Sequence, residues 1–152
     1  MSVVAPGTPV PEFTLRREDF RRFTQDDVAA GTHVLVFYPF AFSPVCTDQL
    51  NLYEEVLEQF AAEGATLYGV SCDSTWALRA FKQRLGVTIE QLSDFEPKGA
   101  TCRAFGVYHE QGGMAQRALV LIEDGVVRWT YEADNPGELP GANLIFDALA
   151  AR

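Results

Sequence analysis

The chain has 152 residues, of which 47% are hydrophobic and 22% charged, a balance typical of a soluble globular protein. Its length suits a single domain over residues 1–152. The net charge of −9 argues against nucleic-acid binding, which needs cations that neutralise phosphates. No apolar run approaches the roughly 18 residues of a membrane span, and residues 1–6 lack the basic and apolar regions of a secretory signal. We therefore expect a cytoplasmic protein that does not bind membranes.

The first half of the chain predicts a hairpin, a helical turn, a buried strand and a long helix. A loose alternation of apolar residues favours the hairpin, and a nearly continuous apolar run favours the buried central strand. Ser43 suits the N-cap of the long helix, Pro44 its first position and Gly64 the residue beyond its end. In chain order these elements are expected at residues 13–23, 24–30, 33–40 and 44–62.

The second half predicts a further βαβα order, an antiparallel hairpin and a last helix. A helix capped by Asp73 or Ser74 ends before Gly86, and the hairpin turns at residues 123–125, which contain a glycine. The elements are expected at residues 65–71, 75–85, 89–92, 97–105, 117–122, 126–131 and 141–151. This order resembles the thioredoxin fold, an α/β architecture in which helices flank a central mixed sheet.

Cys46 is the residue most informative about chemistry. It falls on the third position of the expected helix, where the free amide groups and the positive end of the helix dipole favour a thiolate over a thiol. A free cysteine titrates near ~8.5, and a helix N-terminus is one setting that lowers this value. The sequence thus places a nucleophile where the backbone activates it. The alternative is a small buried cysteine that merely starts a helix.

Other sites are disfavoured by spacing. The three cysteines are far apart and include no C-x-x-C, which opposes a zinc site, a thioredoxin-type dithiol and a disulfide scaffold; they are Cys46, Cys72 and Cys102. No arginine stands six residues after Cys46, so a phosphatase loop is absent. A Cys–His hydrolase would need His33 or His109 beside Cys46. We expect neither a metal nor a cofactor.

The residues around Cys46 match the P-x-x-x-(S/T)-x-x-C signature of the peroxiredoxins. Pro39, Ser43 and Cys46 fill its three fixed places. Further similar segments, in family order and covering nearly the whole chain, are residues 7–15, 92–94, 105–108 and 116–122. The first of them resembles the N-terminal extension of the family. The Phe-Ala-Phe at residues 40–42 and the short C-terminus look closest to the bacterial one-cysteine alkyl hydroperoxide reductase E subgroup.

This resemblance implies a thiol-dependent peroxidase that reduces hydrogen peroxide and organic hydroperoxides through a sulfenic acid on Cys46. It places the site arginine at Arg117, which opens an apolar strand; from the pattern alone an ordinary strand-edge arginine is an equal alternative. Arg117 would stabilise the thiolate and hold the peroxide oxygens. The hydroxyl of Ser43 would both cap the helix and donate to sulfur or peroxide, and Pro39 would shield the thiolate from water.

The substrate pocket is expected to include Val45, whose amide faces the reacting oxygens, and Gln49, one helical turn after the cysteine. Phe42 would add an apolar wall, and Phe40 and Trp76 a wider collar; core or dimer packing is the alternative for each aromatic residue. The subgroup that the chain resembles pairs through loops around the active site, so a homodimer is expected.

The sulfenic acid must be reduced by a second thiol. Neither Cys72 nor Cys102 stands at a usual resolving position of the family, so an external thiol is expected: thioredoxin, a glutaredoxin-like protein or a low-molecular-weight thiol. Cys72 ends the second strand, at the sheet edge where Cys46 should lie, and Cys102 lies in a short helix. Either as an internal resolving thiol is the alternative mechanism. The competing functions are a peroxide-sensing interaction protein and a disulfide oxidoreductase, which the missing C-x-x-C opposes.

Overall fold

A computed structural model describes residues 2–152. Its centre is a seven-stranded sheet with the order β2-β1-β5-β4-β3-β8-β9. The strands are β1 (Thr14–Arg16), β2 (Arg22–Thr24), β3 (Thr32–Phe37), β4 (Ala65–Ser71), β5 (Glu90–Ser93), β8 (Ala118–Glu123) and β9 (Val126–Glu132). Strands β3, β4 and β5 are parallel, whereas β8, β9 and the β1–β2 hairpin pair antiparallel. The expected mixed sheet of a thioredoxin-like fold is confirmed.

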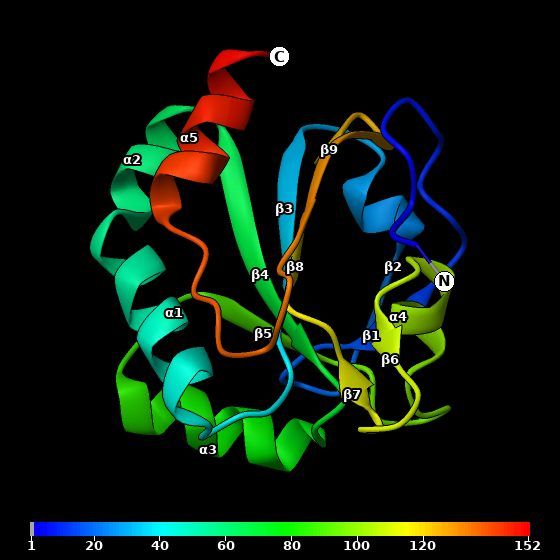
Figure 1. The fold of residues 1–152 in the computed structure, drawn as a ribbon, viewed down its shortest axis with the longest axis vertical. Coiled ribbons are helices and arrows are strands. Elements are labelled where there is room, and N and C mark those ends of the chain that lie inside the picture. Colours follow the sequence, from blue (N-terminus) through cyan, green and yellow to red (C-terminus); the bar gives the residue numbers. More distant parts are fainter. Residues whose placement is uncertain (1) are drawn as a thin grey trace.

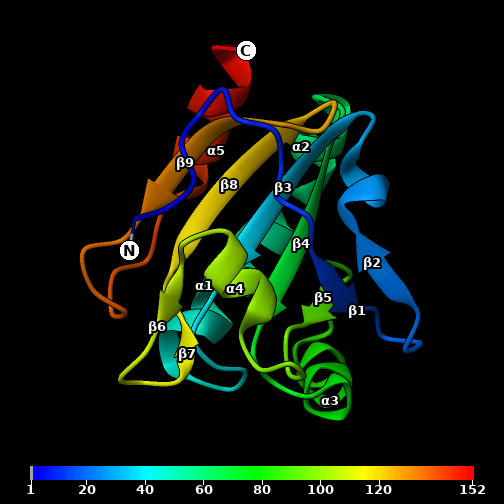
Figure 2. The same ribbon diagram turned by 90° about the vertical axis from the view of Figure 1, so that its right-hand side faces the viewer.

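Helices cover both faces of this sheet (Figure 1). One face carries α1, α2, α3 and α5, and the other carries α4, a small hairpin and the N-terminal segment (Figure 2). The helices are the 3₁₀ helix η1 (Gln25–Val28), α1 (Pro44–Glu55), α2 (Leu57–Ala62), α3 (Thr75–Leu85), α4 (Ala100–Ala104) and α5 (Ala142–Ala150). Within residues 2–152, no helix combines the length and the apolar character that a membrane crossing requires.

The alternation of side chains along the strands divides the core in two. Leu35 and Phe37 of β3 pack toward α4 and the N-terminal segment, and Val34 and Val36 pack toward α1, α2, α3 and α5. All four side chains are fully buried, as are both faces of the strand, which explains its nearly continuous apolar sequence. Each face therefore has its own hydrophobic cluster.

The strand register brings one end of the sheet together. The last residue of β3, Phe37, lies opposite Ala118, the first residue of β8, and beside Val70 of β4. In the same way Ser71 ends β4 beside Ser93, the end of β5. The loops that leave β3, β4 and β5 and the residue that enters β8 thus meet at one edge of the sheet. Ligand sites of open α/β sheets commonly lie at such an edge.

The long helix expected up to residue 62 is interrupted. Val56 leaves helical geometry with φ −114° and ψ 16°, so α1 ends at Glu55 and α2 begins at Leu57. Tertiary bonds fix the end of α1 here: the Glu54 carboxylate accepts from the Thr88 and Ile89 amides at 2.8 and 3.2 Å. A new helix, α2, begins one residue later, and its Phe60 is still buried. Periodicity alone could not show this break, because the side chains that cause it are polar.

One element was not expected from the sequence. Residues Tyr108–His109 (β6) and Met114–Ala115 (β7) form a two-stranded antiparallel hairpin that leads into Arg117. Each strand has only two residues, too short for a period-2 pattern to be visible. The hairpin matters because it leads directly into the start of β8, where the site lies.

Candidate active site

Cys46 lies in the first turn of α1, as the capping pattern predicted. Ser43 is the N-cap in an extended conformation, with φ −70° and ψ 150°, and Pro44 is the first helical residue. The Ser43 carbonyl accepts the first helical bond from the Thr47 amide at 3.0 Å. The Cys46 side chain is fully buried in the cluster between the sheet and α1, α3 and α5. Its sulfur thus sits beside the positive end of a helix and away from bulk water.

The expected cap bond of Ser43 does not form, and that prediction was wrong. Its hydroxyl donates instead to the Phe40 carbonyl at 3.0 Å, and the Ser43 amide reaches the same oxygen at 3.3 Å. The left-handed backbone of Phe42, with φ 71°, closes this turn and brings the Phe40 carbonyl within reach. The Ser43 side chain makes no cap bond to α1. Within residues 2–152, the amides of Val45 and Cys46 thus lack the side-chain acceptor that an N-cap usually supplies.

Arg117 contacts Cys46 directly. Its Nη2 lies 3.3 Å from Sγ of Cys46, and only 3% of the residue is exposed. Its Nε and Nη2 donate to the Pro136 carbonyl at 3.0 and 2.8 Å, and its Nη1 donates to Oε1 of Gln49 at 2.6 Å. Within residues 2–152 no carboxylate lies within 4.0 Å of this guanidinium. A buried positive charge thus faces a sulfur and two neutral acceptors.

Gln49 and Tyr53 extend this network along α1. Gln49 is fully buried, and its Nε2 donates to the Tyr53 hydroxyl at 3.2 Å. That hydroxyl donates in turn to the Pro140 carbonyl at 2.8 Å. Burial raises the pKa of Tyr53 to about 12, so the phenol keeps its proton and remains a donor. The two residues thus tie the site to the segment that precedes α5.

This geometry can be compared with known proteins. A model described as the AhpC/TSA family matches residues 6–130. The chain is 33% identical over 147 residues to alkyl hydroperoxide reductase E of Mycobacterium tuberculosis, and the match covers 95% of each chain. The chain belongs to the AhpC/TSA family. It is a peroxiredoxin and therefore a thiol-dependent peroxidase, which acts on a peroxide and takes its electrons from a thiol.

Two solved structures show the same fold. The crystal structure of Enterococcus faecalis AhpC matches with a TM-score of 0.88 and 25% identity, over 99% of this chain and 92% of that one. Reduced Prx3 of Vibrio vulnificus in complex with H2O2 matches with a TM-score of 0.87 and 25% identity, over 96% of this chain and 99% of that one. The thioredoxin-like fold of this peroxiredoxin therefore agrees with that of its family.

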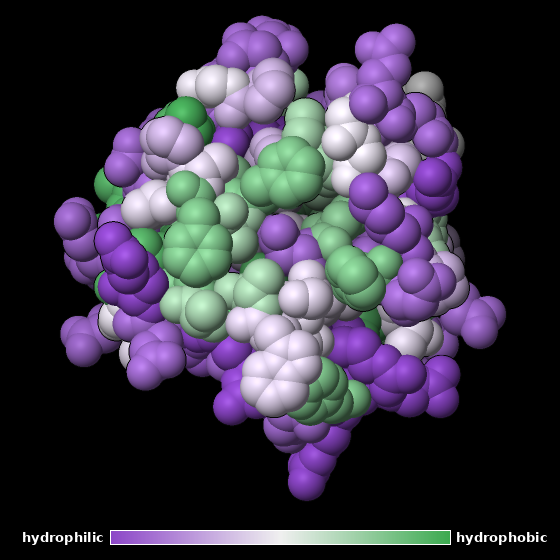
Figure 3. Space-filling view, turned by 90° about the horizontal axis from the view of Figure 1, so that it is seen from below, coloured by the Kyte–Doolittle hydropathy of each residue, from purple (hydrophilic) through white to green (hydrophobic). Residues whose placement is uncertain are grey.

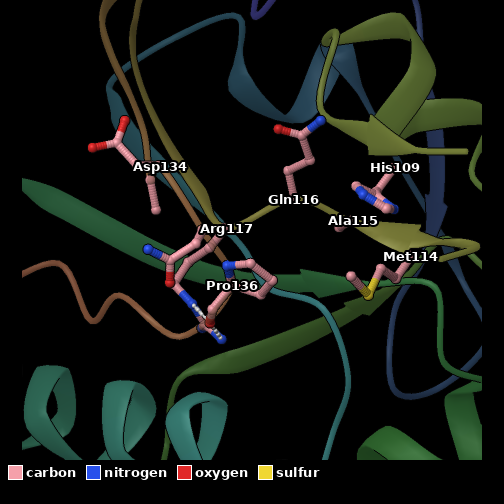
Figure 4. Close-up of a pocket in the computed structure, with 9 residues that line it drawn as sticks. His109, Met114, Ala115, Gln116, Arg117, Asp134 and Pro136 are labelled. Atoms are coloured by element: carbon pink, nitrogen blue, oxygen red, sulfur yellow. Dashed lines mark hydrogen bonds between the residues drawn. The ribbon is translucent and has the colours of Figure 1, made fainter. Parts of the chain in front are cut away.

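A cavity of about 270 Å³ opens beside Arg117. Figure 4 shows Arg117 and Pro136 on one of its sides and His109 and Met114 of the β6–β7 hairpin across from them. The remaining labelled lining residues are Ala115, Gln116 and Asp134. Val45, Gln49 and Phe42 are not among the residues that line this cavity, so their role in a substrate pocket stays a prediction. Val45 is half-buried, Gln49 is buried against Arg117, and Phe42 is exposed. The cavity therefore reaches the arginine of the site from the side of β6 and β7.

Pro39 and the aromatic residues near it differ in burial. Pro39 is buried, whereas Phe40, Phe42 and Trp76 are 43%, 53% and 66% exposed. Phe42 packs on Phe81 of α3 with ring centroids 5.1 Å apart. Seen from this end, the molecule carries hydrophobic side chains at the centre of a hydrophilic rim (Figure 3). These three aromatic side chains are thus largely at the surface, and their role as a collar over the site stays a prediction.

The other cysteines lie on the opposite face of the sheet from Cys46. Cys72 follows β4 and Cys102 lies in α4, and both belong to the cluster that packs Leu35 and Phe37. Their sulfurs are 3.9 Å apart, and together with Asp94 they form the one cluster with metal-ligand character found in residues 2–152. Cys72 does follow the end of β4, at the expected edge of the sheet, but its side chain packs on the face opposite Cys46.

Two features of the site carry no signal in the sequence. Pro136 and Pro140 contribute only backbone carbonyls, and such a group is the same in every residue.

The histidines stay apart from Cys46: Nε2 of His33 lies 2.8 Å from the Ala30 carbonyl, and Nδ1 of His109 accepts from the Gly112 amide at 2.8 Å. In the described chain neither histidine bonds the cysteine, so a Cys–His dyad is absent from residues 2–152.

Proposed function

We propose that Cys46 is the peroxidatic nucleophile of this enzyme. Its thiolate attacks one oxygen of a hydroperoxide in line with the O–O bond. The bond breaks, the sulfur becomes a sulfenic acid, and the distal oxygen leaves as hydroxide or alkoxide and takes up a proton. The substrates are hydrogen peroxide and organic hydroperoxides. The relative from Vibrio vulnificus, whose structure is a complex with H2O2, supports the first of these.

The observation that carries this proposal is the unpaired charge of Arg117. A buried charge is costly unless an opposite charge accompanies it, and residues 2–152 place no carboxylate within 4.0 Å of this guanidinium. Among the hydrogen-bond partners of this guanidinium in residues 2–152, the Cys46 sulfur at 3.3 Å is the one that can ionise. A thiolate at Cys46 would supply the missing counter-charge, and a thiol would not.

The developing charge on the peroxide would be met by fixed donors. The amides of Val45 and Cys46 lie in the first turn of α1, and Nη2 of Arg117 is directed toward the Cys46 sulfur. The Ser43 hydroxyl, now bonded to the Phe40 carbonyl, could turn to a peroxide oxygen by rotation about one bond. Pro39, buried before the loop, would keep water from the sulfur on the strand side.

We propose that an external thiol reduces the sulfenic acid. The first thiol forms a mixed disulfide with Cys46 and releases water. A second thiol then attacks the sulfur of the first thiol, which restores the Cys46 thiol and releases the two external thiols as a disulfide. Cys72 and Cys102 pack on the other face of the sheet, which supports this assignment. The reductant would be thioredoxin, a glutaredoxin-like protein or a low-molecular-weight thiol.

Residues 1–152 are proposed to form one domain that acts in the cytoplasm as a homodimer. Three exposed aromatic residues, Phe40 and Phe42 before α1 and Trp76 at the start of α3, would serve as anchors of the dimer. Sedimentation velocity at micromolar concentration tests this. A dimer in the wild type that becomes a monomer in Trp76→Ala supports the proposal, and a monomer in both redox states of the wild type contradicts it.

Stopped-flow fluorescence followed by intact-mass measurement tests the enzymatic proposal. Hydrogen peroxide and an alkyl hydroperoxide should each add 16 Da at Cys46 in the absence of a thiol, and added thioredoxin or thiol should give many turnovers. A peroxide sensor would react once and stop. Peroxide treatment that leaves Cys46 unmodified, or one turnover with every reductant, would overturn the assignment.

A further inference from the structure

A second pair of sulfur atoms lies buried on the face of the sheet opposite Cys46. Sγ of Cys72 is 3.9 Å from Sγ of Cys102, although the residues are 30 positions apart. One carboxylate joins them: ligand atoms of Asp94 and of both cysteines all lie within 4.8 Å of one another. The proposed peroxidase mechanism uses none of these three residues.

Asp94 holds this pair in place. Its two carboxylate oxygens accept from the Thr101 amide at 3.1 Å and from the Cys102 amide at 2.8 Å, so they fix the first turn of α4. Its own amide donates to the Ser71 carbonyl at 2.8 Å, one residue before Cys72. A single residue therefore positions both cysteine backbones. Because both oxygens are already bonded to amides, the carboxylate is poorly placed to ligate a metal ion.

The two thiols are not equivalent. Either thiol can donate to the other, and donation from Cys102 would lower the pKa of Cys72 and raise that of Cys102. The charge of Lys98 also lowers the pKa of Cys72, whereas burial and the charges of Asp94 and Asp73 raise it. Cys72 is also the more accessible, at 6% exposed against 0% for Cys102. The geometry thus provides an attacking sulfur near the surface and a second sulfur directly behind it.

We propose that Cys72 and Cys102 form a second redox centre, which a hydroperoxide converts to an intramolecular disulfide independently of Cys46. The Cys72 thiolate attacks a peroxide oxygen and becomes a sulfenic acid while the alkoxide or hydroxide takes a proton. The Cys102 thiol then displaces the hydroxyl group as water and forms the S–S bond. Two thiols and one hydroperoxide give one disulfide, one alcohol or water, and one water.

The local structure allows this bond. The sulfurs must approach by about 1.9 Å to reach the ~2.05 Å of a disulfide. Cys72 lies in a bend just beyond β4 rather than in the sheet ladder, and Cys102 lies in a helix of only five residues. Because neither residue belongs to the ladder of the central sheet, we propose that movement at the ends of these two elements closes the gap.

The test uses the Cys46→Ser variant, which retains both cysteines of the second centre and removes the competing thiol. The folded variant is treated with excess hydrogen peroxide, alkylated in denaturant and digested without reductant. We expect a loss of 2 Da, the disappearance of both titratable thiols and a Cys72–Cys102 cross-linked peptide. Dithiothreitol should restore both thiols.

Matched double variants complete the experiment. Cys46→Ser/Cys102→Ala should take up 16 or 32 Da at Cys72 with no loss of 2 Da, because its partner is gone. Cys46→Ser/Cys72→Ala should show little oxidation at Cys102. The proposal is overturned if Cys46→Ser keeps two free thiols after peroxide treatment, if Cys72 is oxidised to a sulfinic acid without the cross-link, or if the disulfide joins two chains. These outcomes are independent of turnover at Cys46, which the variant lacks.

Discussion

The two faces of the central sheet each bury a cysteine site, and the surroundings of the sulfur differ. On one face Cys46 has a guanidinium at 3.3 Å and uncapped amides at the start of a helix. On the other, Cys72 has a thiol at 3.9 Å and a carboxylate whose oxygens are bonded elsewhere. The sulfurs of Cys46 and Cys102 are equally inaccessible, so burial does not distinguish the sites. The sign of the neighbouring charge does.

This contrast assigns a different chemistry to each face. A thiolate beside a fixed cation can attack a peroxide without reorganisation of its surroundings, because hydrogen-bond donors are already in place for the leaving oxygen. A sulfur beside a second thiol has no such cation at hydrogen-bond distance but has a partner for a disulfide.

Removal of the Cys46 sulfur has the largest expected effect. Cys46→Ser should abolish the peroxidase turnover that passes through Cys46 while the fold persists, because a serine hydroxyl is not ionised at neutral pH and fits the third helical position. Cys46→Ser/Cys72→Ala removes the second centre as well and corrects for any peroxide that this centre consumes. Peroxide consumption with an added thiol and far-UV circular dichroism measure the two effects. Cys72→Ser is the control and should retain turnover. Residual turnover in Cys46→Ser together with its loss in Cys72→Ser would move the nucleophile to the other face.

Removal of the cation should have the next largest effect. Arg117→Ala should lower the second-order rate constant with peroxide by about 10²–10³-fold, the loss of about 2.7–4 kcal/mol typical of a donor to a developing oxyanion. Arg117→Lys should fall in between, because it keeps a charge and loses the planar set of donors. Stopped-flow rates measure both, with the exposed Arg128→Ala as the control. Equal rates for Arg117→Ala and Arg128→Ala would remove Arg117 from the mechanism.

The sequence predicted the parts of this site that local rules govern. Pro44 and Ser43 mark the start of α1 through capping preferences, and this start fixes the depth of Cys46 in the helix. The apolar runs at β3 and β8 are buried strands. Their pairing places Ala118 opposite Phe37, and therefore Arg117 at the end of the sheet where β3 ends. Register between strands distant in sequence needed the family resemblance, because no local pattern encodes it.

The rest depended on contacts that side-chain patterns do not encode. The Arg117 guanidinium is held by the Pro136 carbonyl, which any residue could supply. Cys72 was expected at the same edge as Cys46, but the alternation of the strand could not settle the side of a residue that lies beyond the strand. Its packing against Cys102 is a tertiary contact across 30 residues. Sequence spacing thus located the edge of the sheet and left the face undetermined.

Gln49 tests whether the position of the cation matters as well as its presence. Gln49→Leu removes the acceptor 2.6 Å from Nη1 of Arg117 and should lower the peroxide rate constant about tenfold, since a hydrogen bond to a charged group is worth about 1.5–3 kcal/mol. Gln49→Glu should be slower still, because its carboxylate would become the counter-ion of Arg117 in place of the thiolate. Stopped-flow rates and urea unfolding separate an effect on the site from one on stability. A faster reaction in Gln49→Glu than in Gln49→Leu would contradict the role of Arg117 as an unpaired cation.

The smallest effect should come from substitution of Tyr53, whose hydroxyl accepts a hydrogen bond from Gln49 on the same face of the sheet. Burial raises its pKa from 10.0 to about 12 in the folded protein. The native state therefore holds this proton to higher pH than the unfolded state does, so stability is fully present below about pH 10 and falls as pH rises toward 12. At pH 11 the wild type should have lost about 1.4 kcal/mol of unfolding free energy through this group. Tyr53→Phe cannot suffer that loss, but it leaves the Pro140 carbonyl without its donor, at a cost of about 1–3 kcal/mol at every pH.

The difference in unfolding free energy between wild type and Tyr53→Phe should therefore be largest at pH 8 and shrink by about 1.4 kcal/mol at pH 11. Urea unfolding at the two pH values measures it, and the subtraction cancels the other titrating groups, which both proteins share. A parallel pair of pH profiles would show that Tyr53 titrates alike in both states. The hydroxyl would then not be held by the buried network that joins Gln49 to Pro140, and the rigid support of the Cys46 face would have to come from the Pro136 carbonyl alone.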